Sequence, residues 1–225
     1  MSILVIAPHA DDEVLGAGAT IARRVAEGIE VNVAVLTGHG EAPHPLWPAA
    51  AWDVSRAECR TACAELGVMQ VHFEELPAAC LDTEPTWRIN QVVKRVIERF
   101  EPTELYLPFP ADLHRDHAVI GYGAVVATRP YLPTGRTVRR VLYYETLSET
   151  HLAPVYLEAA FEPNLFVDVS DHMQCKLAAL ACYASQLQPD GQPRSLSAVQ
   201  ALATLRGSHI GVAAAEAFVV QRIVE

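Results

Sequence analysis

The feature that most constrains the fold is a short apolar run that leads into a cluster of acidic and histidine residues. Ile3-Leu4-Val5-Ile6-Ala7 is followed directly by Pro8-His9-Ala10-Asp11-Asp12-Glu13. An uninterrupted apolar run of this length predicts a strand buried on both faces, as in a parallel sheet. A second run, Leu105-Tyr106-Leu107-Pro108-Phe109, precedes His114-Arg115-Asp116-His117. Open α/β sheets bind ligands at the carboxyl ends of their strands, so both polar clusters are candidate site residues.

The alternation of strand and helix patterns predicts the fold class. Strands are expected at residues 3–7, 30–37, 68–74, 105–109, 138–145, 165–169 and 217–224, and helices at residues 12–27, 53–66, 86–100, 114–127, 170–184 and 196–206. Such alternation over the first 145 residues predicts a right-handed, parallel arrangement. We therefore expect residues 1–225 to form one α/β domain, a Rossmann-like three-layer fold with a mostly parallel sheet.

The charge of the chain limits the partners that it can bind, and its cysteine content indicates the cellular compartment. The formal net charge is −10 with histidine neutral, whereas proteins that bind nucleic acid or an anionic membrane surface need a basic patch. No run of about 18 apolar residues predicts a membrane span, and the first residues lack the basic region of a signal peptide. The five cysteines, with Cys59 and Cys63 expected as ordinary thiols of one helix, suit a reducing compartment, so we expect a cytoplasmic protein.

His9, Asp11 and Asp12 have both a structural and a catalytic interpretation. A single Asp here would cap the N-terminus of the following helix. Two consecutive Asp residues followed by Glu13 place like charges together, which costs energy unless a cation offsets them. Imidazole and carboxylate ligands suit zinc, which takes three protein ligands in a catalytic site, although another divalent metal is also compatible.

The third metal ligand must come from elsewhere in the chain. His117 is the first candidate because it follows another predicted strand, and its spacing from His114 lets one ring bind metal while the other faces substrate. Competing histidines stand at positions 39, 44, 72, 151, 172 and 209. His39 and His44 lie in the loop predicted over residues 38–51, where surface and substrate-binding roles remain alternatives.

Both clusters resemble the two motifs of the LmbE/PIG-L family of zinc-dependent deacetylases. Residues 8–13 resemble Pro-His-Pro-Asp-Asp-Glu, with Ala10 in place of the second proline, and residues 114–117 resemble His-x-Asp-His. Arg56 and Glu58 are similar to the Arg-x-Glu helix of this family. The resemblance extends through nearly the whole chain at Tyr143-Tyr144-Glu145, Lys176, Ser185-Gln186 and Arg206-Gly207.

The resemblance implies which residues bind the metal and which one moves a proton. His9, Asp12 and His117 would hold zinc, and Asp11 would be the general base that takes a proton from the attacking water. Glu13 would cap the helix or orient a ligand rather than react.

His114 would stabilise the oxyanion that forms during amide hydrolysis. Asp116 would bind His114 and keep it protonated. The leaving amine would receive its proton from Asp11 or from His114.

Three further residues are candidate substrate contacts. By the same resemblance, Arg56 would bind a sugar hydroxyl or an attached phosphate; alternatively it is a solvated residue paired with Asp53 or Glu58. Asp82 stands in a loop where the family carries a sugar-binding acid, but the match there is loose and the residues favour an ordinary loop residue. Glu145 lies at the end of a predicted strand, where it would line the pocket.

Taken with the resemblance, the residues predict a zinc-dependent hydrolase that removes the N-acetyl group of an N-acetylglucosamine-type sugar or conjugate. The expected partner is a small amino-sugar molecule, and a homo-oligomer is compatible with the family. The alternatives are an amidase of a larger sugar conjugate, a metal-dependent phosphoesterase, or a binding module without activity.

Two other enzyme classes lack their motifs. Gly16-Ala17-Gly18 hints at a dinucleotide fingerprint, but Ile21 occupies the third glycine position. We expect these small residues to let the first helix pack closely on the sheet instead. The chain has no Gly-x-Ser-x-Gly sequence, which argues against a serine hydrolase of the α/β type.

Overall fold

A computed structural model describes residues 1–40 and 43–225. Its seven strands are β1 (Ser2–Ala7), β2 (Glu30–Gly38), β3 (Gln70–Pro77), β4 (Glu104–Pro108), β5 (Arg140–Tyr144), β6 (Leu165–Asp168) and β7 (Ala215–Ile223). Its helices are α1 (Asp12–Ala26), α2 (Ala49–Glu65), α3 (Thr86–Phe100), α4 (Arg115–Ala127), α5 (Pro133–Thr137), α6 (Met173–Ala181) and α7 (Leu196–Ser208), with a 3₁₀ turn η1 (Leu81–Thr83).

All seven strands form one sheet in the order β3-β2-β1-β4-β5-β7-β6. The first five strands of this order are parallel to one another, and β7 runs antiparallel between β5 and β6. The predicted α/β fold with a mostly parallel sheet is confirmed. Because β1 pairs with β2 on one side and β4 on the other, the strand order reverses beside β1. Such a reversal opens a crevice at the carboxyl ends of the two strands.

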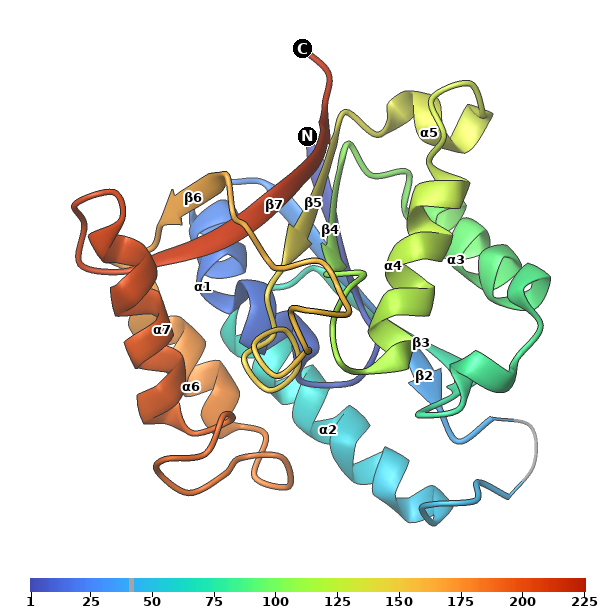
Figure 1. Ribbon diagram of the computed structural model, residues 1–225, viewed down its shortest axis with the longest axis horizontal. Helices are drawn as coiled ribbons and strands as arrows, with labels where there is room; N and C mark the ends of the chain where they lie inside the picture. The colour runs from blue at the N-terminus through green and yellow to red at the C-terminus, as the bar shows by residue number, and fades with distance from the viewer. Residues whose placement is uncertain (41–42) are drawn as a thin grey trace.

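Helices cover both faces of the sheet (Figure 1), with α1, α2, α6 and α7 on one face and α3, α4 and α5 on the other. The side chains of β1 alternate between the two resulting cores. Ile3 and Val5 belong to the core beneath α1, while Leu4 and Ile6 belong to the core beneath α3 and α4. This two-sided burial is the physical reason for the uninterrupted apolar run.

Gly16 lets α1 lie directly against the sheet. A Cβ atom at this position would overlap the ring of Tyr144, so a larger residue cannot be accommodated without a shift. The Tyr144 hydroxyl in turn donates a hydrogen bond of 2.9 Å to the carbonyl oxygen of Ile6. The prediction that the small residues of α1 serve close packing is confirmed.

A buried ion pair fixes the middle of α1. The Lys176 ammonium lies 2.5 Å from a carboxylate oxygen of Glu216 and donates a 2.8 Å hydrogen bond to the carbonyl of Leu15. The Glu216 carboxylate accepts hydrogen bonds from the backbone N–H groups of Ala19 and Thr20. These contacts hold the helix whose first turn carries the polar cluster.

The predicted elements occur in the expected order, with differences at their ends. Helix α2 begins at Ala49 rather than at Asp53, and α5 lies between the helix predicted at residues 114–127 and the strand predicted at residues 138–145, where no helix was predicted. Within the loop predicted over residues 38–51, residues 41–42 lie outside the described part of the chain. Within residues 1–40 and 43–225, no helix combines the length and apolar character that a membrane crossing requires.

Candidate active site

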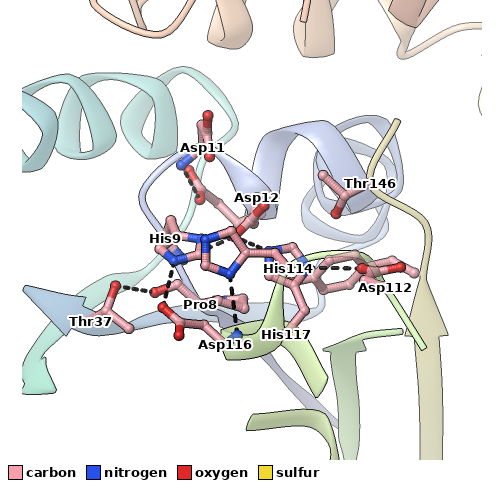
Figure 2. Close-up of polar contacts among 12 residues, drawn as sticks. Pro8, His9, Asp11, Asp12, Thr37, Asp112, His114, Asp116, His117 and Thr146 are labelled. Atoms are coloured by element: carbon pink, nitrogen blue, oxygen red, sulfur yellow. Dashed lines mark hydrogen bonds and ion pairs between the residues drawn. The ribbon is translucent and has the colours of Figure 1, made fainter. Parts of the chain in front are cut away.

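The two polar clusters meet (Figure 2) where the paired strands β1 and β4 end. His9 follows β1, Asp12 begins α1, and His117 lies in the first turn of α4. One ligand atom from each of these residues lies within 4.8 Å of the other two. The fold therefore brings the three predicted metal ligands together.

His117 is oriented by a carboxylate that the sequence analysis did not identify. The Nδ1 atom of His117 lies 2.8 Å from Oδ2 of Asp112, and both side chains are fully buried. The other ring nitrogen, Nε2, is buried without a hydrogen-bond partner among residues 1–40 and 43–225, and it lies 3.2 Å from Oδ2 of Asp12. A histidine that donates from one nitrogen to a carboxylate and leaves the other free is the usual arrangement of a metal ligand.

His9 is oriented in the same way by Asp116. Its Nε2 atom lies 3.0 Å from Oδ2 of Asp116, while its Nδ1 atom lies 3.3 Å from Oδ2 of Asp12. The Asp116 carboxylate also accepts the backbone N–H groups of Ala79 and Leu81, at 2.6 and 3.2 Å. Asp116 therefore orients His9, which is one of the predicted metal ligands.

The charges of the triad favour a cation between its members. Burial disfavours protonated His9, but Asp116 and Asp12 outweigh this and raise its pKa to about 9. Burial likewise opposes protonation of His117, while Asp12 and Asp112 raise its pKa to about 10. Burial disfavours ionised Asp12, yet the two imidazoles hold its pKa well below the ordinary value. A divalent metal can replace these protons, so the donor set fits a metal ion.

A second triad, His9, His114 and Asp116, also places ligand atoms within 4.8 Å of one another. Its carboxylate is already occupied by two backbone N–H donors and by His9. The unpartnered Nε2 atom belongs instead to His117. The geometry therefore favours a metal among His9, Asp12 and His117.

Asp11 lines the cavity beside the triad with an unusual backbone conformation. Its φ is 131°, a value that L-residues rarely adopt. Its backbone N–H donates to Oε2 of Glu13 at 3.1 Å, and the buried Tyr183 hydroxyl donates to the other oxygen of Glu13. Glu13 therefore holds the loop that presents Asp11, a role beyond the predicted helix cap.

The carboxyl group of Asp11 experiences opposing influences on its pKa. Burial and the neighbouring Asp12 charge raise the pKa of Asp11 well above its ordinary value. Arg194 opposes this rise, with a guanidinium nitrogen 3.7 Å from Oδ2 of Asp11. A carboxylate with a raised pKa is suited to accept a proton and release it again.

His114 lies at the start of α4, where its Nδ1 atom accepts the backbone N–H of Asp116 at 3.2 Å. This bond leaves Nε2 as the protonated nitrogen of the neutral ring. Burial and the charge of His9 lower the pKa of His114 to about 4. The expectation that the Asp116 carboxylate keeps His114 protonated is wrong, because that carboxylate faces His9. His114 is instead a neutral donor.

A cavity of about 400 Å³ adjoins the triad. The predicted residues that line it are His9, Asp11, Asp12, Arg56, His114 and His117. Arg56 reaches it from α2 and pairs with Glu75 at 2.6 Å, rather than with Asp53 or Glu58. Its position allows contact with a bound molecule.

The other two candidate substrate contacts do not line this cavity. Asp82 is exposed in η1. Glu145 is buried and accepts hydrogen bonds from Nε and Nη2 of Arg206, at 2.8 and 2.6 Å, with His151 at 2.8 Å from the same carboxylate. Its surroundings are those of a buried ion pair.

Several cavity and supporting residues were not identified from the sequence. Asp112 stands in the same loop as His114. Its position shortly before the predicted ligand His117 is the sequence signal that could have identified it. Trp47 lines the cavity from the segment before α2, Trp52 from the first turn of α2, and Arg194 from the loop before α7. Nothing local in the sequence points Arg194 toward Asp11.

The comparisons with known proteins agree with this site. A family model described as PIG-L, GlcNAc-PI de-N-acetylase, matches residues 4–128, a span that contains both polar clusters. The family match and the deacetylase relatives identify an N-deacetylase, a hydrolase that cleaves an amide to release an amine. The chain belongs to the PIG-L family, also called LmbE-like, so the predicted resemblance is confirmed.

Individual relatives cover most of the chain. The diacetylchitobiose deacetylase of Thermococcus kodakarensis is 30% identical over 202 residues, which are 84% of this chain and 71% of that protein. The solved structure of the conserved protein TT1542 from Thermus thermophilus has a TM-score of 0.77 and 26% identity, covering 99% of this chain and 96% of the other. A 4-carboxy-2-hydroxymuconate hydratase from Pseudomonas putida shares the fold alone, with a TM-score of 0.76, 20% identity, and coverage of 100% and 98%.

Proposed function

We propose that this chain removes the N-acetyl group of an N-acetylglucosamine-type sugar or sugar conjugate, with zinc held by His9, Asp12 and His117. The observation that carries the proposal is the buried, unpartnered Nε2 atom of His117, which Asp112 orients toward Asp12. Two imidazoles and one carboxylate match the ligand set of catalytic zinc sites with an open position. The diacetylchitobiose deacetylase relative supports the substrate class.

Zinc, when bound, supplies Lewis-acid polarisation of the scissile amide and of the attacking water. Asp11 accepts the proton of that water, because its carboxylate lines the cavity and its raised pKa favours proton uptake. The same carboxyl group then delivers the proton to the departing amine. Arg194 favours the ionised form of Asp11, since its positive charge opposes the rise in pKa.

His114 donates a hydrogen bond to the oxygen of the amide as negative charge develops on it. Its Nδ1 atom is occupied by a backbone N–H, so Nε2 carries the available proton. A neutral imidazole at a helix N-terminus can polarise a carbonyl in this manner. Asp116 contributes by orienting His9.

Arg56 remains the proposed substrate contact, because it lines the cavity. A guanidinium group there can bind sugar hydroxyls or an anionic substituent. The cytoplasmic setting and the homo-oligomer remain predictions.

The proposal is tested by scoring free-amine release from a panel of N-acetyl sugars and nucleotide sugars, with zinc present. Chelation should abolish release and zinc should restore it. Asp11→Asn should retain zinc and lose most activity; unchanged activity with bound zinc would show that the base is misassigned. Release of phosphate from phosphorylated sugars, without any amine release, would favour the phosphoesterase alternative.

A further inference from the structure

A group of side chains that can ligate a metal lies behind the proposed base, outside the two triads described above. Cys59 and Cys63 of α2 and Glu13 of α1 each offer one ligand atom, and these three atoms lie within 4.8 Å of one another. All three side chains are buried, and the Cys59 thiol donates a 3.7 Å hydrogen bond to Oε1 of Glu13. The two cysteines thus gain a third ligand from a different helix.

The two thiols are spaced for a shared cation rather than for a disulfide bond. Cys59 and Cys63 are four residues apart on α2, and the Cβ atoms of such a pair are about 5–6 Å apart. A disulfide bond requires about 3.5–4.5 Å between these atoms, so it would distort the helix. A cation between the sulfur atoms avoids this distortion, because each metal–sulfur bond adds about 2.3 Å to the span.

The ligand types select a thiophilic cation. Thiolates bind soft and borderline metal ions, whereas Mg²⁺ and Ca²⁺ take oxygen ligands. The neighbouring Cys59 thiol and burial raise the pKa of Cys63 above its ordinary value, so an entering cation has to displace a proton. The proposed catalytic triad of His9, Asp12 and His117 contains no sulfur, so the two sites differ in the cations that they prefer.

The thiols adjoin the wall of the catalytic cavity. Ser55 lines this cavity, and Cys59 follows Ser55 by one helical turn, so both side chains lie on the same side of α2. Asp11 and Asp12 line the same cavity and directly precede Glu13. A cation that enters the cavity is therefore one turn of α2 away from the nearer thiol.

Glu13 connects the thiols to the proposed base. Its Oε1 atom accepts hydrogen bonds from the Cys59 thiol and the Tyr183 hydroxyl, while its Oε2 atom accepts the backbone N–H of Asp11 at 3.1 Å. A cation at Oε1 displaces at least one of the two donors there and shifts the carboxylate. This shift disturbs the bond that holds Asp11 at its φ of 131°.

We propose that Cys59, Cys63 and Glu13 form a second metal site for a thiophilic divalent cation, and that a cation bound there slows the reaction at Asp11. No bond of the substrate changes at this site, and the thiol protons pass to solvent as the cation binds. The existence of the site is independent of the proposed function, whereas its effect on the rate rests on that function.

Binding is tested with Cd²⁺ on the zinc-loaded protein. Cadmium bound to thiolates gives an ultraviolet charge-transfer band that histidine and carboxylate ligands do not give. One cadmium per chain should bind with this band while the zinc content stays constant. Cys63→Ala should lose the band. Cys182→Ala, the matched control, should retain it, because Cys182 follows α6 and lies outside the ligand group.

The effect on the rate is measured as kcat for amine release with and without Cd²⁺, each variant being compared with its own cadmium-free value. Cadmium should lower kcat by about a hundredfold in the unmodified protein and in Cys182→Ala, because a small displacement of a catalytic group has an effect of this size. It should leave Cys63→Ala at its cadmium-free value. If Cys63→Ala does not fold, Cys63→Ser, which retains the size of the side chain, takes its place.

The outcomes separate this proposal from the proposed function. Absence of the thiolate band in the folded, zinc-loaded protein would overturn the site. A band without any change in kcat would overturn the connection through Glu13. Equal inhibition of the unmodified protein and Cys63→Ala would also overturn it, because cadmium would then act elsewhere. A band that Cys63→Ala lacks, in a protein that releases no amine from any sugar, would support the site and contradict the proposed deacetylation.

Discussion

Glu13 accepts the backbone N–H of Asp11 through Oε2 at 3.1 Å, and this bond holds Asp11 at a φ of 131°. Glu13 is fully buried, with its other oxygen bound to the Tyr183 hydroxyl. A strained backbone persists only where surrounding contacts hold it in place. The motif thus contains both the proposed base and the residue that positions it.

The first prediction concerns this contact. Glu13→Ala should lower kcat by about a hundredfold, because a small displacement of a catalytic group has an effect of this size. Glu13→Gln should recover part of the loss, since its amide oxygen can still accept the Asp11 N–H. Both kcat values are measured by stopped assays of amine release, and the metal content of each variant is measured in parallel. Wild-type kcat in a folded, metal-loaded Glu13→Ala protein would contradict the positioning role.

The second prediction concerns the carboxylate behind His117. Asp112→Ala should weaken metal affinity by roughly 10- to 100-fold, because it frees the ring that Asp112 orients. Competition with a chromogenic chelator measures the affinity. Asp171→Asn, an exposed residue just before α6, is the control and should bind metal as the unmodified protein does. Equal affinity in both variants would remove Asp112 from the metal site.

The third prediction links metal binding to pH. In the metal-free protein the pKa values of His9 and His117 are raised to about 9 and 10, so both rings are protonated at neutral pH. Coordination requires the neutral rings, so metal uptake should release about two protons. Calorimetry in buffers of different ionisation enthalpy counts them. Uptake without proton release would contradict the raised pKa values of the two rings in the metal-free protein.

The same shifts determine how pH affects the metal-free fold. Because both pKa values exceed the ordinary value of 6.5, their contribution to stability is complete below 6.5. It should decline as the pH rises through about 9 to 10. Urea titrations of chelated protein across this range provide the measurement, with zinc-loaded protein as the comparison.

The fourth prediction concerns the buried pair of Glu145 and Arg206. Burial opposes ionisation of Glu145, but His151 and Arg206 hold its pKa below the ordinary value of 4.5. The pair's contribution to stability is therefore present above pH 4.5 and lost as the pH falls below it. Glu145→Gln should destabilise the protein by about 3–5 kcal/mol, because it leaves a buried guanidinium without its negative counter-charge.

A control separates this buried pair from surface charge. Glu158 forms a 3.5 Å pair with the exposed Arg115, so Glu158→Gln should change the unfolding free energy by less than about 1 kcal/mol. If Glu145→Gln and Glu158→Gln unfold at the same urea concentration, the buried pair stabilises the protein no more than the surface pair does.

Much of the site follows from local patterns. Two-sided burial required β1 to be apolar from Ile3 to Ala7. The polar residues after β1 and β4 had to meet at the sheet's edge because parallel strands end on the same side. The predicted ligands His9, Asp12 and His117 therefore came together as expected. The partner of Asp116 did not follow from spacing, because His9 reaches it across the sheet rather than along the helix.

The sequence by itself determined the order of the elements, the parallel sheet and the residue types of the metal site, because periodicity and motif are properties of neighbouring residues. Only the tertiary structure decided that Glu145 pairs with Arg206, that Asp112 orients His117, and that Trp47 and Arg194 share one cavity with the proposed base. These contacts depend on how loops from separate strand ends converge. No local pattern encodes that convergence, because it is set by the packing of helices on both faces of the sheet.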